Sequence, residues 1–299
     1  MTKRPRRRKS ASSDIVDGET KESRKNEKPF EEHELEKIEE EAPSRAPVIF
    51  ETIRRMGDDE LSRPAMALAV SGFLAGVAIG LSVFSEALLR THLPDTPWRP
   101  LIENFGYTIG FLVVILGQMQ LFTENTITAV CPVLDTPRRS TVFAMLRLWA
   151  IVFAMNLVGA SLFGLILFLT AGWQPNVWPA IAELSEHALS YGWMETMLRG
   201  VGAGWIIALL VWIMPNASAS KPLVIILMTY LIALADFSHV VAGTAEAAVV
   251  VLTGTESLFE ALGGFILPAL TGNILGGTVF FTFLAWAQIK TELEQGKSG

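Results

Sequence analysis

Two stretches of this chain share one pattern, in which a long apolar segment is interrupted by a short polar break. In the first half, residues 109–133 are mostly apolar except for the break at 120–126. In the second half, residues 223–252 are mostly apolar except for the break Asp-Phe-Ser-His at 236–239. Paired interruptions at corresponding places in two hydrophobic halves are typical of inverted-repeat membrane transporters.

The residues that follow each break also correspond. Asn156-Leu-Val-Gly lies about as far beyond Thr123 as Asn273-Ile-Leu-Gly lies beyond His239. This spacing aligns Thr123 with His239. The alternative is a chance similarity between apolar helices of like composition.

Glycines recur at four-residue steps in the segment before each break. They are Gly72, Gly76 and Gly80 in one half, and Gly200 and Gly204 in the other. Such steps allow helix backbones to approach closely. The contact lies either within one subunit or between subunits, and the sequence leaves both open.

Composition supports a membrane protein. The chain has a mean hydropathy of +0.39 and 51% hydrophobic residues, although most of its 24 Lys and Arg precede residue 64. Six segments are long enough to cross about 30 Å of hydrocarbon: 64–89, 101–134, 141–170, 193–214, 222–252 and 258–289. Three crossings in each half is an odd number, so the halves enter from opposite sides. We predict an all-α membrane protein with two inverted three-helix repeats and broken second and fifth helices.

The sequence divides into four parts. Residues 1–45 are predicted to be a disordered cytoplasmic tail, because they are highly charged and contain few apolar residues. Residues 46–62 form an amphipathic interfacial helix, residues 63–291 the six-span channel domain, and residues 292–299 a cytoplasmic C-terminus. Lys and Arg are concentrated in the tail and in the even-numbered loops. This distribution places both termini in the cytoplasm of a multi-pass inner (plasma) membrane protein.

Three short motifs carry a resemblance to a known family. They are Leu121-Phe-Thr in the first break, Phe237-Ser-His in the second, and Gly272-Asn-Ile-Leu-Gly-Gly in the last span. Over about residues 47–291 the sequence resembles the formate/nitrite transporters, which are membrane channels for small monovalent anions. The resemblance implies an aquaporin-like fold of six spans per protomer, assembled as a homopentamer with one pore in each protomer.

The same resemblance implies roles for individual residues. His239 would be the central pore histidine, with Thr123 as its partner, and Asn273 would be a pore amide. The side chains expected to line or narrow the pore are Phe122, Tyr107, Phe111 and Ile232.

Two departures from the family pattern concern the pore. The second pore Asn, on the fourth span, would fall at or near Gly204, and the Lys often found in the loop before that span is missing. His187 is the nearest basic candidate. We expect His187, Asp236 and Glu124 to lie in the vestibules. Glu86 with Arg90, and Glu195 with Arg199, are spaced as i,i+4 ion pairs at the outward ends of the first and fourth spans.

An apolar constriction with one histidine favours a particular substrate class. A bare carboxylate in a dry constriction carries a desolvation cost of order 20 kcal/mol in the ideal limit and several after relaxation. A small weak acid avoids that cost by crossing as the neutral molecule. A histidine, with an unperturbed pKa of about 6.5, can supply the proton.

We therefore predict a channel or proton-coupled permease for small monovalent weak-acid anions such as formate or nitrite. It is not an enzyme and needs no cofactor; its partners are its own copies, protons, the anion and membrane lipid, with no nucleic acid. The alternative is a neutral small-solute pore. An intramembrane enzyme or metal site would have to use Asp236, His239 and Glu246, and a purely structural scaffold would leave the matched breaks unexplained.

Overall fold

A computed structural model describes residue 34, residue 42 and residues 44–296, and all regular structure within these residues is helical. The predicted tail at 1–45 falls almost entirely outside the described residues, as does the end of the chain at 297–299. The principal helices are α3 (Ala46–Ser62), α4 (Ala65–His92), α5 (Pro100–Leu116), α6 (Asn125–Thr128), α7 (Cys131–Asp135), α8 (Arg139–Thr170), α9 (Trp178–Leu189), α10 (Trp193–Ala217), α11 (Lys221–Leu234), α12 (Val240–Thr253), α13 (Leu258–Glu260), α14 (Leu267–Ile274) and α15 (Leu284–Gly296).

Length and composition distinguish the helices that could span a membrane. Four stretches qualify: Ala65–His92, Arg139–Trp173, Trp193–Leu234 and Leu258–Thr291. Two further apolar helices, α5 and α12, are shorter than a complete span. The last stretch joins α13, α14 and α15 through two π-helical segments, Ala261–Ile266 and Leu275–Phe283.

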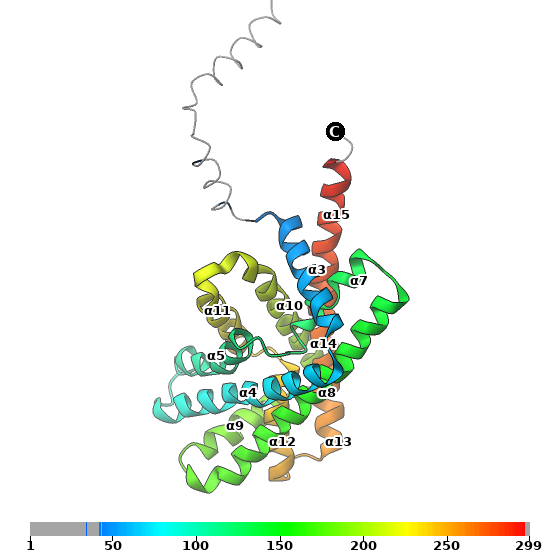
Figure 1. The fold of residues 1–299 in the computed structure, drawn as a ribbon. Helices are drawn as coiled ribbons and strands as arrows, with labels where there is room; N and C mark the ends of the chain where they lie inside the picture. The colour runs from blue at the N-terminus through cyan, green and yellow to red at the C-terminus, as the bar shows by residue number, and fades with distance from the viewer. Residues whose placement is uncertain (1–33, 35–41, 43, 297–299) are drawn as a thin grey trace, which may run out of the picture. The chain divides into compact units, whose positions relative to one another are not determined.

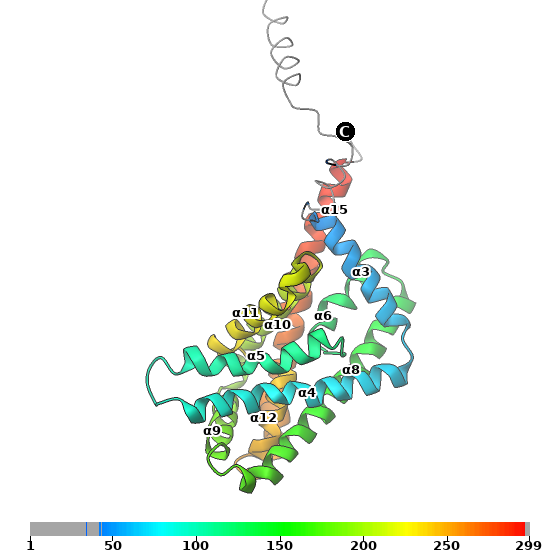
Figure 2. The same ribbon diagram turned by 60° about the vertical axis from the view of Figure 1, so that its left-hand side comes forward.

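The helices pack as two similar groups. In the first group α4 packs against α5 and α8, and in the second α10 packs against α11 and α14. Contacts between α5 and α11, and between α8 and α12, join the groups (Figure 1). Helix α15 continues the last stretch and lies beside α3 at one end of the bundle (Figure 2).

Helix α9 differs from the prediction. The sequence predicts that the residues between the third and fourth spans form a loop. Helix α9 is a 12-residue amphipathic helix that packs on α12 and α4. Its buried face includes Ile181, Ser185 and Leu189. A helix this short has no span-length apolar run, so a search for membrane crossings overlooks it.

Helix α3 spans Ala46–Ser62 and buries only part of its apolar surface. Ile49, Phe50 and Ile53 are buried, whereas Val48 and Met56 are about half exposed. The buried side chains face α6, α7, α8 and α10. That α3 lies at a membrane surface remains a prediction.

The four-residue glycine steps make contacts within the chain. Gly76 on α4 lies against the backbone of Asn156 on α8, and Gly204 on α10 lies against the backbone of Asn273 on α14. A Cβ at either position would overlap those backbone atoms. The sequence left open whether the glycines pack within one subunit or between subunits. Gly76 and Gly204 pack within one subunit.

We expect Gly204→Ala to destabilise the protein by about 1–3 kcal/mol, the usual cost of overpacking. Gly263→Ala is the matched control, because Gly263 is helical and has open space where a Cβ would sit. Thermal unfolding in detergent should show a lower midpoint for Gly204→Ala and an unchanged or higher one for Gly263→Ala. Equal midpoints for the two variants would contradict the close helix contact.

Candidate pore and its two breaks

The helices α5 and α11 end in the same unusual turn. Gln118 and Asp236 both have positive φ, at 51° and 58°, which is uncommon for residues other than glycine. The next amide in each case donates to the carbonyl five residues earlier, at 3.0 Å from Met119 and 2.9 Å from Phe237. The two breaks therefore correspond residue by residue, at a spacing of 118 positions.

A buried asparagine on α8 holds the first break. The Asn156 side-chain oxygen accepts the Phe122 N–H at 2.8 Å. Its amide nitrogen donates to the carbonyls of Gln120, at 2.9 Å, and Gly72, at 2.7 Å. Since buried backbone groups need hydrogen-bond partners, this one side chain satisfies the unwound chain on both sides of Leu121.

Asn273 on α14 does the same for the second break. Its oxygen accepts the Val240 N–H at 2.9 Å, and its nitrogen donates to the carbonyls of Ser238, at 2.9 Å, and Gly200, at 2.8 Å. The side chain is fully buried and both of its N–H groups are used. In this structure Asn273 binds the backbone of the second break, and its role as a pore amide remains a prediction.

These bonds also fix the register of the two breaks. Ser238 and Val240 correspond to Gln120 and Phe122, so the residue equivalent to His239 is Leu121. The sequence spacing aligned His239 with Thr123 instead, which is wrong by two residues. Distances along the chain to the next helix do not define the register of a loop, whereas its hydrogen bonds do.

His239 joins the two breaks. Its Nε2 lies 2.8 Å from the Thr123 hydroxyl oxygen, and the imidazole is only 2% exposed. Its Nδ1 accepts the Ala242 N–H at 3.2 Å, so His239 caps the N-terminus of α12. Because Nδ1 is an acceptor there, the geometry fits a neutral imidazole whose proton is on Nε2 and is donated to Thr123.

Aromatic and apolar side chains close the space around this contact. Phe111 stands edge-on to the imidazole with ring centroids 5.0 Å apart, and Tyr107 packs on Phe111 at 5.3 Å. Ile232 is fully buried. Phe122 is also buried, and it packs on the aromatic rings of Trp149 and Phe153 of α8.

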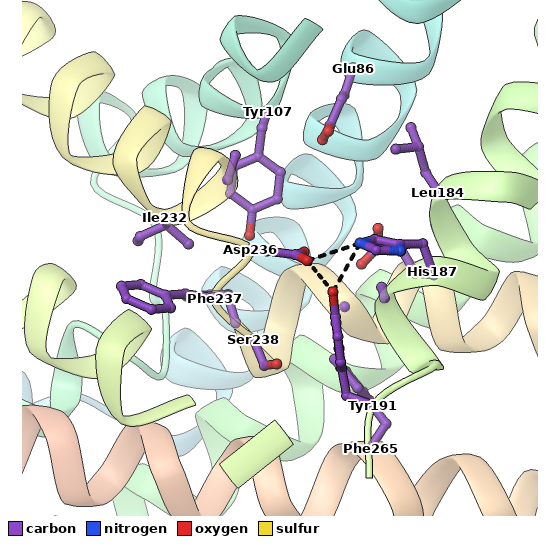
Figure 3. Close-up of a pocket in the computed structure, with 15 residues that line it drawn as sticks. Glu86, Tyr107, Leu184, His187, Tyr191, Ile232, Asp236, Phe237, Ser238 and Phe265 are labelled. Atoms are coloured by element: carbon purple, nitrogen blue, oxygen red, sulfur yellow. Dashed lines mark hydrogen bonds and ion pairs between the residues drawn. The ribbon is translucent and has the colours of Figure 1, made fainter. Parts of the chain in front are cut away.

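Two cavities flank this closed region. The α9-side cavity, of ≈ 70 Å³, is lined by residues that include Glu86, Tyr107, His187, Asp236, His239 and Glu246 (Figure 3). The α3-side cavity, of ≈ 260 Å³, is lined by residues that include Met56, Glu60, Gln120, Leu121, Glu124 and Lys221.

The cavities lie toward opposite ends of the helices. Glu86, near the end of α4, lines one, whereas residues of α3, which precedes α4, line the other. Helix α5 contributes Tyr107 to the first and Ile115, near its other end, to the second. The breaks, with Thr123 and His239, lie between them.

Asp236, in the second break, is the centre of a polar cluster at the α9-side cavity. Its carboxylate accepts a hydrogen bond from the Tyr191 hydroxyl and lies 2.9 Å from the His187 Nε2 (Figure 3). The carboxylate is also 3.4 Å from the Arg199 guanidinium. Arg199 also donates to the Asp236 carbonyl at 2.9 Å. Burial and this hydrogen bond raise the pKa of Tyr191 to about 12, so its hydroxyl remains a donor at neutral pH.

The three expected vestibule residues therefore divide between the two cavities. His187 and Asp236 line the α9-side cavity, and Glu124 lines the α3-side cavity together with Lys221. Tyr191 was not predicted to be a site residue, and Arg199 was predicted only to pair with Glu195. The structure contains that i,i+4 pair, with the Arg199 guanidinium 2.9 Å from the Glu195 carboxylate. Their part in the cluster depends on α9, which the sequence analysis did not expect.

The other predicted i,i+4 pair, Glu86 with Arg90, is wrong. Arg90 is instead bound to Glu103 at 2.8 Å and to Glu183 at 2.5 Å. Glu103 is almost fully buried, so an ion pair stabilises its carboxylate more than it would stabilise the less buried carboxylate of Glu86. Glu86 is left facing the α9-side cavity.

Among the side chains that the structure describes, no group of three or more His, Cys, Asp and Glu is arranged to hold a metal ion. Asp236 and His239, two members of the metal site considered from sequence, have other partners, as described above. Glu246, the third member of that site, has no hydrogen-bond or ion-pair partner among the described residues.

Comparison with known proteins decides the family. The family model described as formate/nitrite transporter matches residues 47–287. The chain belongs to the formate/nitrite transporter family. It is accordingly a membrane transporter or channel and not an enzyme, as the sequence motifs predicted.

Relatives within the formate/nitrite transporter family span most of this chain. Inner membrane protein YfdC of Escherichia coli (strain K12) is 38% identical over 289 residues, which are 94% of this chain and 89% of that protein. Two solved structures share the fold. An FNT family ion channel has a TM-score of 0.68 at 21% identity, covering 81% of this chain and 98% of its own. A pentameric formate channel with formate bound has a TM-score of 0.64 at 20% identity, covering 75% and 97%.

We expect Asn156→Ala and Asn273→Ala to destabilise this family member to a similar degree. Each leaves buried backbone groups of a break unpaired, at about 1–3 kcal/mol for each group. Thermal unfolding in detergent measures the loss, and Asn216→Ala, which removes two exposed hydrogen bonds with the Ser44 backbone, is the control. A variant at 156 or 273 that unfolds at the control's temperature would contradict the role of the asparagines in holding the breaks.

Proposed function

We propose that this protein is a channel or proton-coupled permease for small monovalent weak-acid anions, with formate and nitrite as the leading candidates. The observation that carries the proposal is the buried contact of 2.8 Å between His239 and Thr123. It lies between two cavities and joins two breaks of equivalent structure.

The membrane architecture that we propose has six crossings in two inverted repeats, with an aquaporin-like arrangement. The second crossing would consist of α5 and the segment through α7, and the fifth of α11 and α12 with their break. Non-helical backbone at membrane depth is tolerated only where it is buried in protein or lines a cavity. The equivalent hydrogen bonds of Asn156 and Asn273 support this reading, because each gives one break the partners that lipid cannot.

The closed region between the cavities favours permeation of a neutral molecule. Thr123, Phe111 and Ile232 are fully buried, and in our proposal Phe122, Tyr107 and His239 complete the lining. A bare anion there would lose its hydration at a cost of several kcal/mol even after relaxation. A weak acid that picks up a proton before the constriction avoids this cost, whereas the anion of a strong acid cannot.

The Nε2–H of His239 is the proton nearest the centre of the path. It is donated to Thr123, and a solute oxygen that displaces Thr123 would find a donor already oriented by the Nδ1 cap. Asn273 has a positioning role in this mechanism, since it fixes the backbone on both sides of His239.

The relatives and the charge distribution support a proposed location and assembly. The printed name of the YfdC relative supports an inner-membrane location, and the Lys and Arg distribution supports cytoplasmic termini. The α3-side cavity would then face the cytoplasm. The pentameric formate channel with the same fold supports a homopentamer with one pore in each protomer.

A neutral-solute pore is the second candidate, and one observation favours it. Within the described residues no Lys or Arg lines the α9-side cavity, whereas Glu86, Asp236 and Glu246 do. A net negative lining would not attract free anions. Flux of glycerol that exceeds the flux of formate in proteoliposomes would favour this second function.

We expect His239→Asn to change the pH dependence of flux and the preference for weak-acid over permanent anions. Asparagine is a good N-cap residue, so α12 keeps its cap while the titratable proton is lost. Stopped-flow flux of formate, nitrite, acetate and chloride in proteoliposomes across a range of pH measures the effect. Thr123→Val is the control, since it removes the hydroxyl partner but leaves the imidazole.

An unchanged pH profile and an unchanged order of substrates in His239→Asn would make His239 a packing residue. A change of equal size in Thr123→Val would assign the effect to loss of their contact instead of the proton.

Native mass spectrometry of the purified protein should give a homopentamer. The reason is the fold shared with a pentameric channel and the large apolar side chains that remain exposed on a single protomer. Leu169, Phe143 and Phe259 are 67%, 73% and 84% exposed. A monomer or a tetramer as the main species would reject this assembly.

A further inference from the structure

The α9-side cavity contains two carboxyl groups without a partner. Glu86 comes from α4 and Glu246 from α12, and both line the same ≈ 70 Å³ (Figure 3). Among the described residues neither side chain has a hydrogen bond or an ion pair. Asp236, which lines the same cavity, has three partners.

Glu86 is unpaired because its neighbouring cation is bound elsewhere. Arg90, one helical turn away, is shared by Glu103 and Glu183. Arg199 is likewise occupied by Glu195 and Asp236. Arg90 and Arg199 therefore both bind other carboxylates, and no Lys or Arg lines the cavity within the described residues.

A buried hydroxyl points into the same space. Tyr107 on α5 is 8% exposed, and its hydroxyl has no hydrogen-bond partner within the described residues. Figure 3 shows this hydroxyl directed into the cavity. The ring of Tyr107 packs on Phe111, which in turn contacts His239. An unsatisfied donor at this position is suited to a ligand oxygen.

Charge decides which form the two carboxyl groups take. A carboxylate that has no hydrogen-bond or ion-pair partner in a narrow cavity loses part of its solvation without compensation, and a second carboxylate in the same cavity adds repulsion. A bound proton removes both costs and converts the carboxylate into an O–H donor. Such a donor forms a strong charge-assisted hydrogen bond with an incoming carboxylate.

We propose that Glu86 and Glu246 form a proton-exchange site that protonates small carboxylate anions in the α9-side cavity, with the Tyr107 hydroxyl holding the substrate oxygen. The proposal rests on the weak-acid transport function above. It narrows the substrate class to short carboxylic acids, because a substrate carboxylate that enters the same cavity is desolvated as the two glutamates are, which brings the proton affinities of donor and acceptor close together. The small volume limits the chain length of the substrate.

The step is a simple proton transfer. The O–H bond of the glutamic acid breaks and an O–H bond forms on the substrate carboxylate, while the electron pair stays on the glutamate. Water at the mouth of the cavity then returns a proton to the glutamate. The neutral acid moves on to the constriction at Thr123 and His239.

Other charged or titratable groups around the site have different roles. They are His187 and Glu183 on α9, Tyr191, Arg199 on α10, Asp236 and His239 at the second break, and Arg90 with Glu103 beside Glu86. Asp236 is already occupied by Arg199, Tyr191 and His187, so we assign it no part in the proton transfer.

The first test does not depend on transport. Infrared spectra of the full-length protein in detergent should contain, at neutral pH, the carbonyl band of a protonated carboxyl group. The band should be lost in the double variant Glu86→Gln and Glu246→Gln, and retained in Glu186→Gln, an exposed carboxylate of α9 that does not line the cavity. Its absence from the wild type, or its persistence in the double variant, would overturn the proposal.

The second test is formate and acetate flux in proteoliposomes. The double variant should be slower by at least roughly tenfold at neutral pH. This is a conservative expectation, because a positioned proton donor usually contributes more than tenfold to a rate. The deficit should shrink as the pH falls, because more of the acid is then already neutral. Glu246→Asp, which keeps a titratable group, should recover part of the rate, and Glu186→Gln should match the wild type.

The remaining outcomes separate the possible failures. Unchanged flux and an unchanged pH profile in the double variant would reject the role of Glu86 and Glu246 as proton donors. Faster flux of formate and chloride in this variant would also reject it, because the two carboxylates would then only repel anions. Methylammonium flux that the double variant abolishes would identify a cation site instead. A wild type that carries no weak acid, yet has the infrared band, would reject the transport function while leaving the proton site standing.

Discussion

The structure depends on how unwound backbone is satisfied inside a helical bundle. Both α5 and α11 stop in the interior, and each stop leaves amide and carbonyl groups that no helix can pair. Asn156 on α8 and Asn273 on α14 meet this need, each for the break in its own group of helices and each with one accepted and two donated bonds. Close glycine contacts bring α8 and α14 near enough for these side chains to reach.

This arrangement also sets the chemistry of the centre. Since Asn273 binds the backbone on both sides of His239, the imidazole is held with Nδ1 on the α12 amide and Nε2 toward Thr123. The equivalent position in the first break is Leu121. Two breaks with nearly the same backbone therefore present different side chains, one polar and one apolar, and the centre carries a single titratable group instead of two.

The charges are arranged around this centre unevenly. Arginines near the α9-side cavity are bound to Glu103, Glu183, Glu195 and Asp236, which leaves carboxyl groups as its charged lining, with His187 at its edge. The α3-side cavity is larger and has Lys221 beside Glu124 and Glu60. In the proposed function, a substrate would meet proton-carrying groups on one side of the constriction and a mixed-charge vestibule on the other.

The sequence by itself determined the family, the long apolar helices and the location of the breaks, because hydrophobic runs and the motifs around Thr123, His239 and Asn273 are local features. It also placed Thr123 and His239 together, through the family resemblance. The register of the breaks, the partners of Arg90 and the role of α9 were decided only by the tertiary structure. The physical reason is the same in each case. A buried amide or carboxylate takes the partner nearest in space, and that partner is up to about a hundred residues away in the chain, where neither spacing nor helical periodicity can identify it.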